Sequence, residues 1–204
     1  MLKTKITALL FAFGTLIGAV NSAYGADFSN HKSLVVFFSL IHNRELAPND
    51  EQLNKQVGNT EVIADLIAKE TGADVFSLQT VTKYPQEYSD TLEIAQREQN
   101  ESARPELVST PDISEYDTIF VGFPCWYSTY PMVIATFLES ADFAGKNIIP
   151  FCTHGGSRFG RSIRDFEQAL PQSNIIDGFE IRSSQVNSPA TIQNIRDFLN
   201  EIEL

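Results

Sequence analysis

The chain has 204 residues, of which 43% are apolar and 20% are charged, and its formal net charge is −11 at pH 7. That length is enough for one well-buried domain and rather short for two. The excess of acidic residues argues against nucleic acid or an anionic lipid surface as the partner.

The first 25 residues have the layout of a secretory signal peptide. Lys3 and Lys5 precede an apolar run over 6–20, and small residues follow this run just before Ala26. A membrane anchor is the alternative, but a helix that spans a bilayer needs about 20 apolar residues and this run is shorter. The sequence therefore predicts a signal peptide over 1–25, one domain over 26–204, and export to the periplasm or the medium.

Short runs rich in β-branched and aromatic residues alternate with segments of helical periodicity in the rest of the chain. Strands are expected at 34–38, 74–78, 118–123, 147–151 and, more weakly, 175–181. Helices are expected at 61–71, 86–100, 132–139, 162–170 and 190–202. This alternation predicts an α/β domain, with a parallel sheet that helices cover on both faces.

The connection over 40–57 is long, because such folds usually use 2–6 residues between a strand and the next helix. It lies between Ser39 and the sequence Gly58-Asn59-Thr60, which opens the first helix. A glycine, a hydroxyl group and a helix N-terminus together suit a phosphate group. An ordinary helix cap is the alternative.

Two further loops follow the third and fourth strands, where ligands of open α/β sheets bind. The first is "GFPCWYSTYP", with Trp126 and Tyr127, and the second is "THGGS" over 153–157. Aromatic faces and backbone amides of these loops would complete a slot for a flat polar ring. His154 has no second ligand at metal-binding spacing, so no metal site is predicted.

Cys125 and Cys152 come at the ends of two strands that we expect to be neighbours. An oxidising compartment would permit a disulfide bond between them, since adjacent strands lie about 4.8 Å apart. Two buried, unpaired thiols are the alternative.

Several segments together resemble the flavodoxin-like family, in its branch with a THGGS loop. They are "SLVVFFS", "VGNTEVIADLIAKETGADVFSL", "KYPQEY", "ARPEL", "YDTIFVGFPCWYSTYPMVIATFLES" and "GKNIIPFCTHGGSRFG". The resemblance implies a three-layer sandwich with a five-stranded parallel sheet in the order 2-1-3-4-5, and a bound FMN. Here, unlike in the family, 18 residues over 40–57 interrupt the phosphate loop.

The resemblance also assigns residues to the cofactor. It places the phosphate on Ser39, Gly58, Asn59 and Thr60. It places the flavin beside Pro124, Trp126, Tyr127 and Ser128, with the other edge of the ring along Thr153, His154, Gly155, Gly156 and Ser157.

These assignments favour an FMN-dependent redox protein, but three functions are possible for this fold. The first is an electron carrier that meets a basic partner protein. Loss of residues 1–25 removes two lysines and no acidic residue, so the net charge changes from −11 to −13 and would steer such a partner. The second is an NAD(P)H:quinone-type reductase, and the third is a binding module without cofactor.

Processing of the N-terminus can be measured directly. We expect the exported protein to begin at Ala26 or within a few residues of it, because a small-residue cleavage site ends there. Intact-mass spectrometry of the exported protein gives the result. A mass that still includes residues 1–25 would refute both the cleavage and the export to the periplasm.

Overall fold

The computed structural model describes residues 28–45 and 56–204, so the expected signal peptide and domain start lie outside the described residues. The helices are α1 (Asn59–Thr71), α2 (Tyr88–Asn100), α3 (Met132–Leu138), α4 (Ser162–Ala169) and α5 (Thr191–Glu201), with short 3₁₀ turns η1 (Phe28–Asn30), η2 (Leu40–His42) and η4 (Ser183–Gln185). The strands are β1 (Ser33–Phe38), β2 (Asp74–Leu78), β3 (Thr118–Pro124), β4 (Asn147–His154), β5 (Asn174–Ile175) and β6 (Phe179–Arg182). None of the helices in these two ranges is long and apolar enough to cross a membrane.

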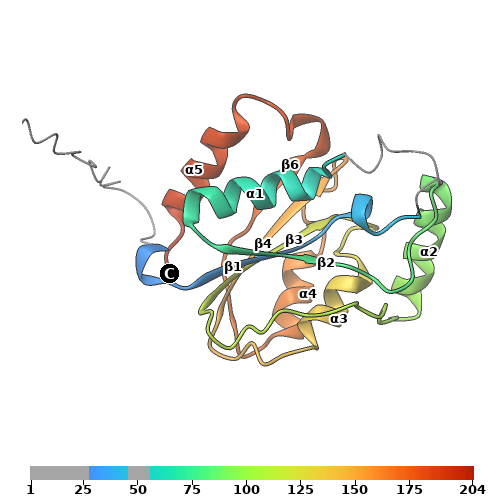
Figure 1. Cartoon of the computed structure of the whole chain (residues 1–204), viewed down its shortest axis with the longest axis horizontal. Helices are drawn as coiled ribbons and strands as arrows, with labels where there is room; N and C mark the ends of the chain where they lie inside the picture. Colours follow the sequence, from blue (N-terminus) through green and yellow to red (C-terminus); the bar gives the residue numbers. More distant parts are fainter. Residues whose placement is uncertain (1–27, 46–55) are drawn as a thin grey trace, which may run out of the picture.

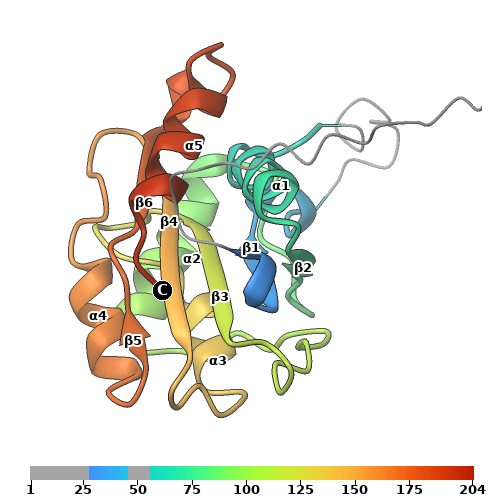
Figure 2. The ribbon, with the colours of Figure 1, turned by 90° about the vertical axis from the view of Figure 1, so that its left-hand side faces the viewer.

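The strands form one parallel sheet in the order β2-β1-β3-β4-β5, and β6 also pairs with β4. Helices α1 and α5 cover one face, while α2, α3 and α4 lie on the other (Figure 1). In the view turned by 90°, β5, β4, β3, β1 and β2 lie side by side in the order of the sheet (Figure 2). The predicted fold class and strand order are therefore confirmed.

The predicted helices and strands agree with the structure to within a few residues at their ends. Strand β4 makes the largest difference, because it continues three residues beyond the expected end at 151. Thr153 and His154 consequently belong to the strand, and the loop that follows contains only Gly155, Gly156 and Ser157 of the "THGGS" sequence.

The fifth expected strand is split into β5 and β6, with residues 176–178 between them. The register changes there by one residue, since Ile148 lies opposite Ile175 but Phe151 lies opposite Phe179. Pro150 explains the break. The carbonyl group of Ile148 points toward β5 and accepts a hydrogen bond from the backbone amide of Ile176. Every second residue of a strand points to the same neighbouring strand, so Pro150 faces this side as well, but it has no N–H to donate.

The start of the long connection after β1 is held by the buried side chain of Asn43. Its amide nitrogen donates to the carbonyl groups of Ser39 and Leu78, at 2.8 and 3.1 Å. Its amide oxygen accepts from the backbone and the hydroxyl group of Thr80, at 2.7 and 3.2 Å. This part of the predicted 40–57 connection is thus fixed to the end of β2, while residues 46–55 lie outside the described residues.

Truncation of Asn43 should destabilise the fold strongly. Asn43→Ala leaves buried backbone groups of three residues unpaired, and each such group costs about 1–3 kcal/mol. We expect the free energy of unfolding to fall by at least about 2 kcal/mol in urea denaturation followed by far-UV circular dichroism. Asn200→Ala, at an exposed position of α5, is the matched control and should change it by less than about 0.5 kcal/mol. Equal effects of the two substitutions would contradict this role of Asn43.

Candidate functional site

The first part of the candidate site lies where the chain leaves β1 and enters α1. Ser39 is buried at the end of β1, and Gly58 immediately precedes α1. A Cβ atom on Gly58 would lie only 2.0 Å from the hydroxyl oxygen of Ser39. The two residues are therefore in direct contact despite the 18 residues between them in the sequence, and a side chain at position 58 would displace the hydroxyl group of Ser39.

Two backbone amides at the start of α1 are available to a ligand. Those of Asn59 and Thr60 make no hydrogen bond with any other described residue. The preceding amide, of Gly58, donates to Glu61 Oε2 at 3.2 Å, and the same oxygen lies 2.7 Å from His42 Nε2. A helix N-terminus with free amides favours an anion. Here the Glu61 carboxylate already accepts from the amide of Gly58, and the next two amides remain without a partner among the described residues.

A contact between two threonines joins the start of α1 to the end of β4. The hydroxyl oxygens of Thr60 and Thr153 are 3.0 Å apart, and both side chains are buried. The predicted phosphate residues and the predicted ring-binding loop therefore meet at one edge of the sheet, at the carboxyl ends of β1 and β4.

Trp126 is buried, although it lies at the start of a turn. Only 6% of the residue is exposed. Its ring packs edge-on against Phe38, at 5.6 Å between centroids and 87°, and against Tyr84, at 5.5 Å and 82°. Edge-to-face packing with these two neighbouring rings holds Trp126 in the core, and its assignment beside the flavin stays a prediction.

Tyr127 is the ring that the turn displays, with 38% of the residue exposed. Tyr127 and Ser128 have φ angles of +45° and +63°, the left-handed pair of a type I′ turn. Trp126 and Thr129 close this turn with two backbone hydrogen bonds of 2.9 and 3.1 Å. Left-handed residues other than glycine cost about 1–2 kcal/mol each, so the strain must be offset by contacts around the turn.

The neighbouring loop supplies those contacts. The amide of Arg161 donates to the carbonyl group of Ser128 at 2.7 Å. Gly160 lies so close that a Cβ atom there would be 2.3 Å from the same carbonyl oxygen. The turn that carries Tyr127 is consequently locked to the loop after β4.

The loop after β4 offers a second run of free amides. Gly155, Gly156 and Ser157 are exposed, and their backbone amides make no hydrogen bond within the described part of the chain. No heavy atom lies within 4 Å of a Cβ atom added at Gly155, so the space beside this residue is open. Pro124, at the end of β3, lies opposite Thr153 and beside this opening.

The side chain of His154 is buried. Its Nε2 atom bonds to a carboxylate oxygen of Glu180 on β6, and its Nδ1 atom has no partner among the described residues. Nothing in the sequence pairs these two residues, because they meet only through the β4–β6 pairing. The spacing of Gly58 and Glu61, in contrast, is that of a capping box and could have revealed the carboxylate at the start of α1.

Both cysteines are free thiols in the structure. Cys152 lies opposite Phe123, two residues before Cys125, so the two thiols are diagonal neighbours across β3 and β4. Diagonal pairs are about 7–8 Å apart, beyond the usual distance for a disulfide bond. Burial raises the pKa of both thiols.

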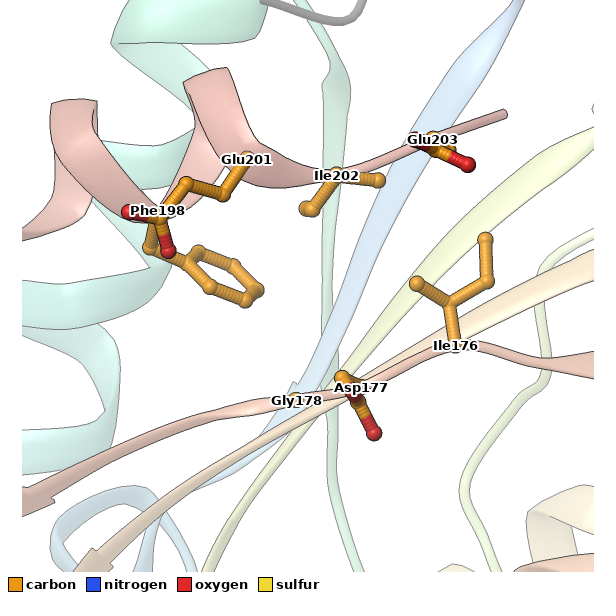
Figure 3. A pocket seen from close by; sticks show the side chains of 7 residues that line it. All are labelled: Ile176, Asp177, Gly178, Phe198, Glu201, Ile202 and Glu203. Atoms are coloured by element: carbon orange, nitrogen blue, oxygen red, sulfur yellow. The ribbon is translucent and has the colours of Figure 1, made fainter.

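The cavity shown in Figure 3 lies elsewhere, between the β5–β6 junction and the end of α5. Its volume is about 460 Å³, and Phe198 and Ile202 face Ile176 across it. The polar side chains that line it are the carboxylates of Asp177, Glu201 and Glu203. Such a lining repels a phosphate and offers no side-chain donor to a polar ring, so the site at the carboxyl ends of the strands is the candidate.

A family model for flavodoxins matches residues 54–201. A candidate flavoprotein from Bacteroides eggerthii is 25% identical with a TM-score of 0.68, over 85% of this chain and 100% of that one. Another, from Bacteroides uniformis, is 27% identical with a TM-score of 0.65, over 84% and 99%. None of the curated proteins matches.

A flavoprotein from Lactobacillus acidophilus, solved in complex with FMN, has the same fold. It is 19% identical with a TM-score of 0.59, over 77% of this chain and 97% of that one.

The contrast between Trp126 and its neighbour can be measured by stability. Trp126→Ala removes a buried ring and should lower the free energy of unfolding by about 3–5 kcal/mol. Tyr127→Ala removes a partly exposed ring and should lower it by less than about 1 kcal/mol. Urea denaturation followed by far-UV circular dichroism compares the two variants. Similar losses in both would mean that the two rings contribute equally to the core.

Proposed function

The chain belongs to the flavodoxin family, and on that premise we propose that it binds FMN and transfers electrons in the periplasm. The observation that carries the proposal is the 3.0 Å contact between Thr60 and Thr153. It brings two groups of backbone amides to one edge of the sheet, those of Asn59 and Thr60 and those of 155–157. Neither group has a hydrogen-bond partner among the described residues. The first suits a phosphate group and the second suits the polar edge of a flat ring.

The phosphate of FMN would lie at the start of α1. Asn59 and Thr60 offer their backbone amides there, and the positive end of the helix dipole favours the anion. Ser39 adds a hydroxyl group, which the contact with Gly58 holds in place. This arrangement supports phosphate binding through neutral donors: no lysine or arginine belongs to it, and the Glu61 carboxylate beside Gly58 opposes the anion.

The ring system of FMN would lie between Tyr127 and the loop after β4. Tyr127 is the exposed aromatic ring of the site, and ring stacking adds about 0.5–1.5 kcal/mol beyond the burial of area. The free amides of Gly155, Gly156 and Ser157 can donate to the polar edge of the ring. The open space beside Gly155 leaves room for that edge. Trp126 would hold Tyr127 in place, because its buried ring anchors the turn that carries Tyr127.

Bound FMN supplies the exchange of one or two electrons, and the residues of the chain bind it, orient it and exclude water from its faces. Electron transfer to another protein needs an exposed ring edge, and Pro124 and Ser128 would border that edge. The net charge of −11, and of −13 after removal of 1–25, supports a redox partner with a basic surface.

FMN binding can be tested by titration of the cofactor-free protein, followed by quenching of flavin fluorescence. Tyr127→Ala should weaken binding at least about tenfold, because stacking and buried area are lost together. Gly155→Ala should weaken binding as well, since its methyl group would occupy the space assigned to the ring. The fold itself should tolerate that methyl group, because nothing lies within 4 Å of it.

Tyr88→Ala is the matched control for the aromatic substitution, because Tyr88 is 60% exposed at the start of α2 and does not belong to the site. It should leave the affinity unchanged. Wild-type protein that does not quench flavin fluorescence would refute the proposed function. Binding that is unaffected by both Tyr127→Ala and Gly155→Ala would refute the placement of the ring.

A further inference from the structure

The start of α1 carries a carboxylate at the place to which the phosphate of FMN is assigned. Glu61 Oε2 accepts from the backbone amide of Gly58 at 3.2 Å, directly before the free amides of Asn59 and Thr60. A carboxylate at a helix N-terminus stabilises the helix, but it also repels a phosphate that approaches the same end. Whatever offsets this negative charge will control how well the phosphate binds.

His42 is the group that can offset it. Its Nε2 atom lies 2.7 Å from Glu61 Oε2, and no other basic side chain pairs with Glu61 in the described part of the chain. The side chains of His42 and Glu61 are 35% and 20% exposed, so a proton can reach the pair from solvent. The pair carries one net negative charge when the imidazole is neutral and none when it is protonated.

The turn that carries His42 is fixed in place. His42 ends η2, at the start of the 40–57 connection, and the neighbouring Asn43 anchors this turn to β2. Lys83, in the loop after β2, donates from its Nζ atom to the carbonyl group of His42 at 3.0 Å. The residues that interrupt the phosphate loop thus bring a titratable side chain to the start of α1.

Other charged groups lie on the elements around this pair. They are Asp65 on α1, Lys83 after β2, and Arg44 and Glu45 beyond His42 in the sequence. Burial and the Glu61 carboxylate raise the pKa of Asp65, and burial lowers the pKa of Lys83. Histidine is the side chain whose charge ordinarily changes between pH 5 and 8, so His42 is the group to test in that range.

We propose that His42 is a positioning residue of the phosphate site and makes FMN binding depend on pH. Protonated His42 holds the Glu61 carboxylate and neutralises its charge. The free amides at the start of α1 then bind phosphate more tightly than they do when His42 is neutral. The proposal rests on the proposed FMN site and adds a control of its affinity. Riboflavin, which has the same ring but no phosphate, should respond far less to this pair.

The first test measures the dissociation constants of FMN and riboflavin by quenching of flavin fluorescence, at low ionic strength and at pH 5.5 and 8.0. Their ratio isolates the contribution of the phosphate and cancels effects of pH on the ring, including any from His154. In His42→Gln, which keeps an N–H donor, this contribution should fall at least about threefold at pH 5.5 and change less than about 1.5-fold at pH 8.0. The second ionisation of the phosphate itself, near pH 6, affects all variants alike at a given pH.

His31→Gln is the matched control. His31 is also a partly exposed histidine, 29% exposed and 3.0 Å from a carboxylate oxygen of Asp117, but it lies beside the amino end of β1. Its substitution should leave the contribution of the phosphate unchanged at both pH values.

Glu61→Gln is the opposite change, because it removes the negative charge and keeps an oxygen for the amide of Gly58. It should strengthen the contribution of the phosphate at least about threefold at pH 8.0, a gain that general damage to the fold cannot produce. Unchanged binding or equal losses at both pH values in His42→Gln, or no gain in Glu61→Gln, with FMN still bound, would overturn this proposal and leave the FMN site intact.

A second measurement does not depend on FMN. Inorganic sulfate keeps both negative charges at pH 5.5, and its titration into the ¹⁵N-labelled protein without FMN should shift the amide signals of Asn59 and Thr60. The dissociation constant should rise at least about threefold in His42→Gln and stay the same in His31→Gln. If the protein binds no FMN, the proposed function fails, and this titration then decides the proposal alone: shifts that are absent, or equally strong in His42→Gln, overturn it.

Discussion

Burial of β1 on both faces is the constraint on which the rest of the structure depends. All six residues of Ser33–Phe38 are buried, so helices must cover both sides of the sheet and a strand must lie on each flank. Parallel pairing then brings the carboxyl ends of β1, β3 and β4 to one edge. The candidate site consists of the loops that follow these three strands.

Much of this arrangement could be predicted from the sequence, because apolar runs buried on both faces are easy to recognise. Ser39, Gly58, Thr60 and Thr153 were expected near the carboxyl ends of the strands, where ligands of such sheets bind, and they lie there in the structure. The order of the strands came from the resemblance to a family and not from the composition of the runs. The interruption between Ser39 and Gly58 did not separate them, because the turn after β1 is fixed to β2 through Asn43.

Other features depend on contacts that the sequence does not encode locally. Type I′ turns usually contain asparagine or glycine, whereas this turn has Tyr127 and Ser128, so nothing in the sequence shows which aromatic ring is displayed. Trp126 is buried because Phe38 and Tyr84, from distant parts of the chain, pack against it. The pairing of His154 with Glu180 likewise requires β6, which we predicted as one continuous strand with β5.

The break opposite Pro150 also affects how the molecule behaves in a concentrated solution. A sheet edge with a long, regular row of free N–H and C=O groups can pair with the edge of another molecule and start aggregation. Here the edge consists of two strands of two and four residues, interrupted at 176–178. A strand from another molecule could form hydrogen bonds with this edge over only a few residues, because the edge is interrupted at 176–178. The proline inside β4 thus protects this edge of the sheet from intermolecular pairing.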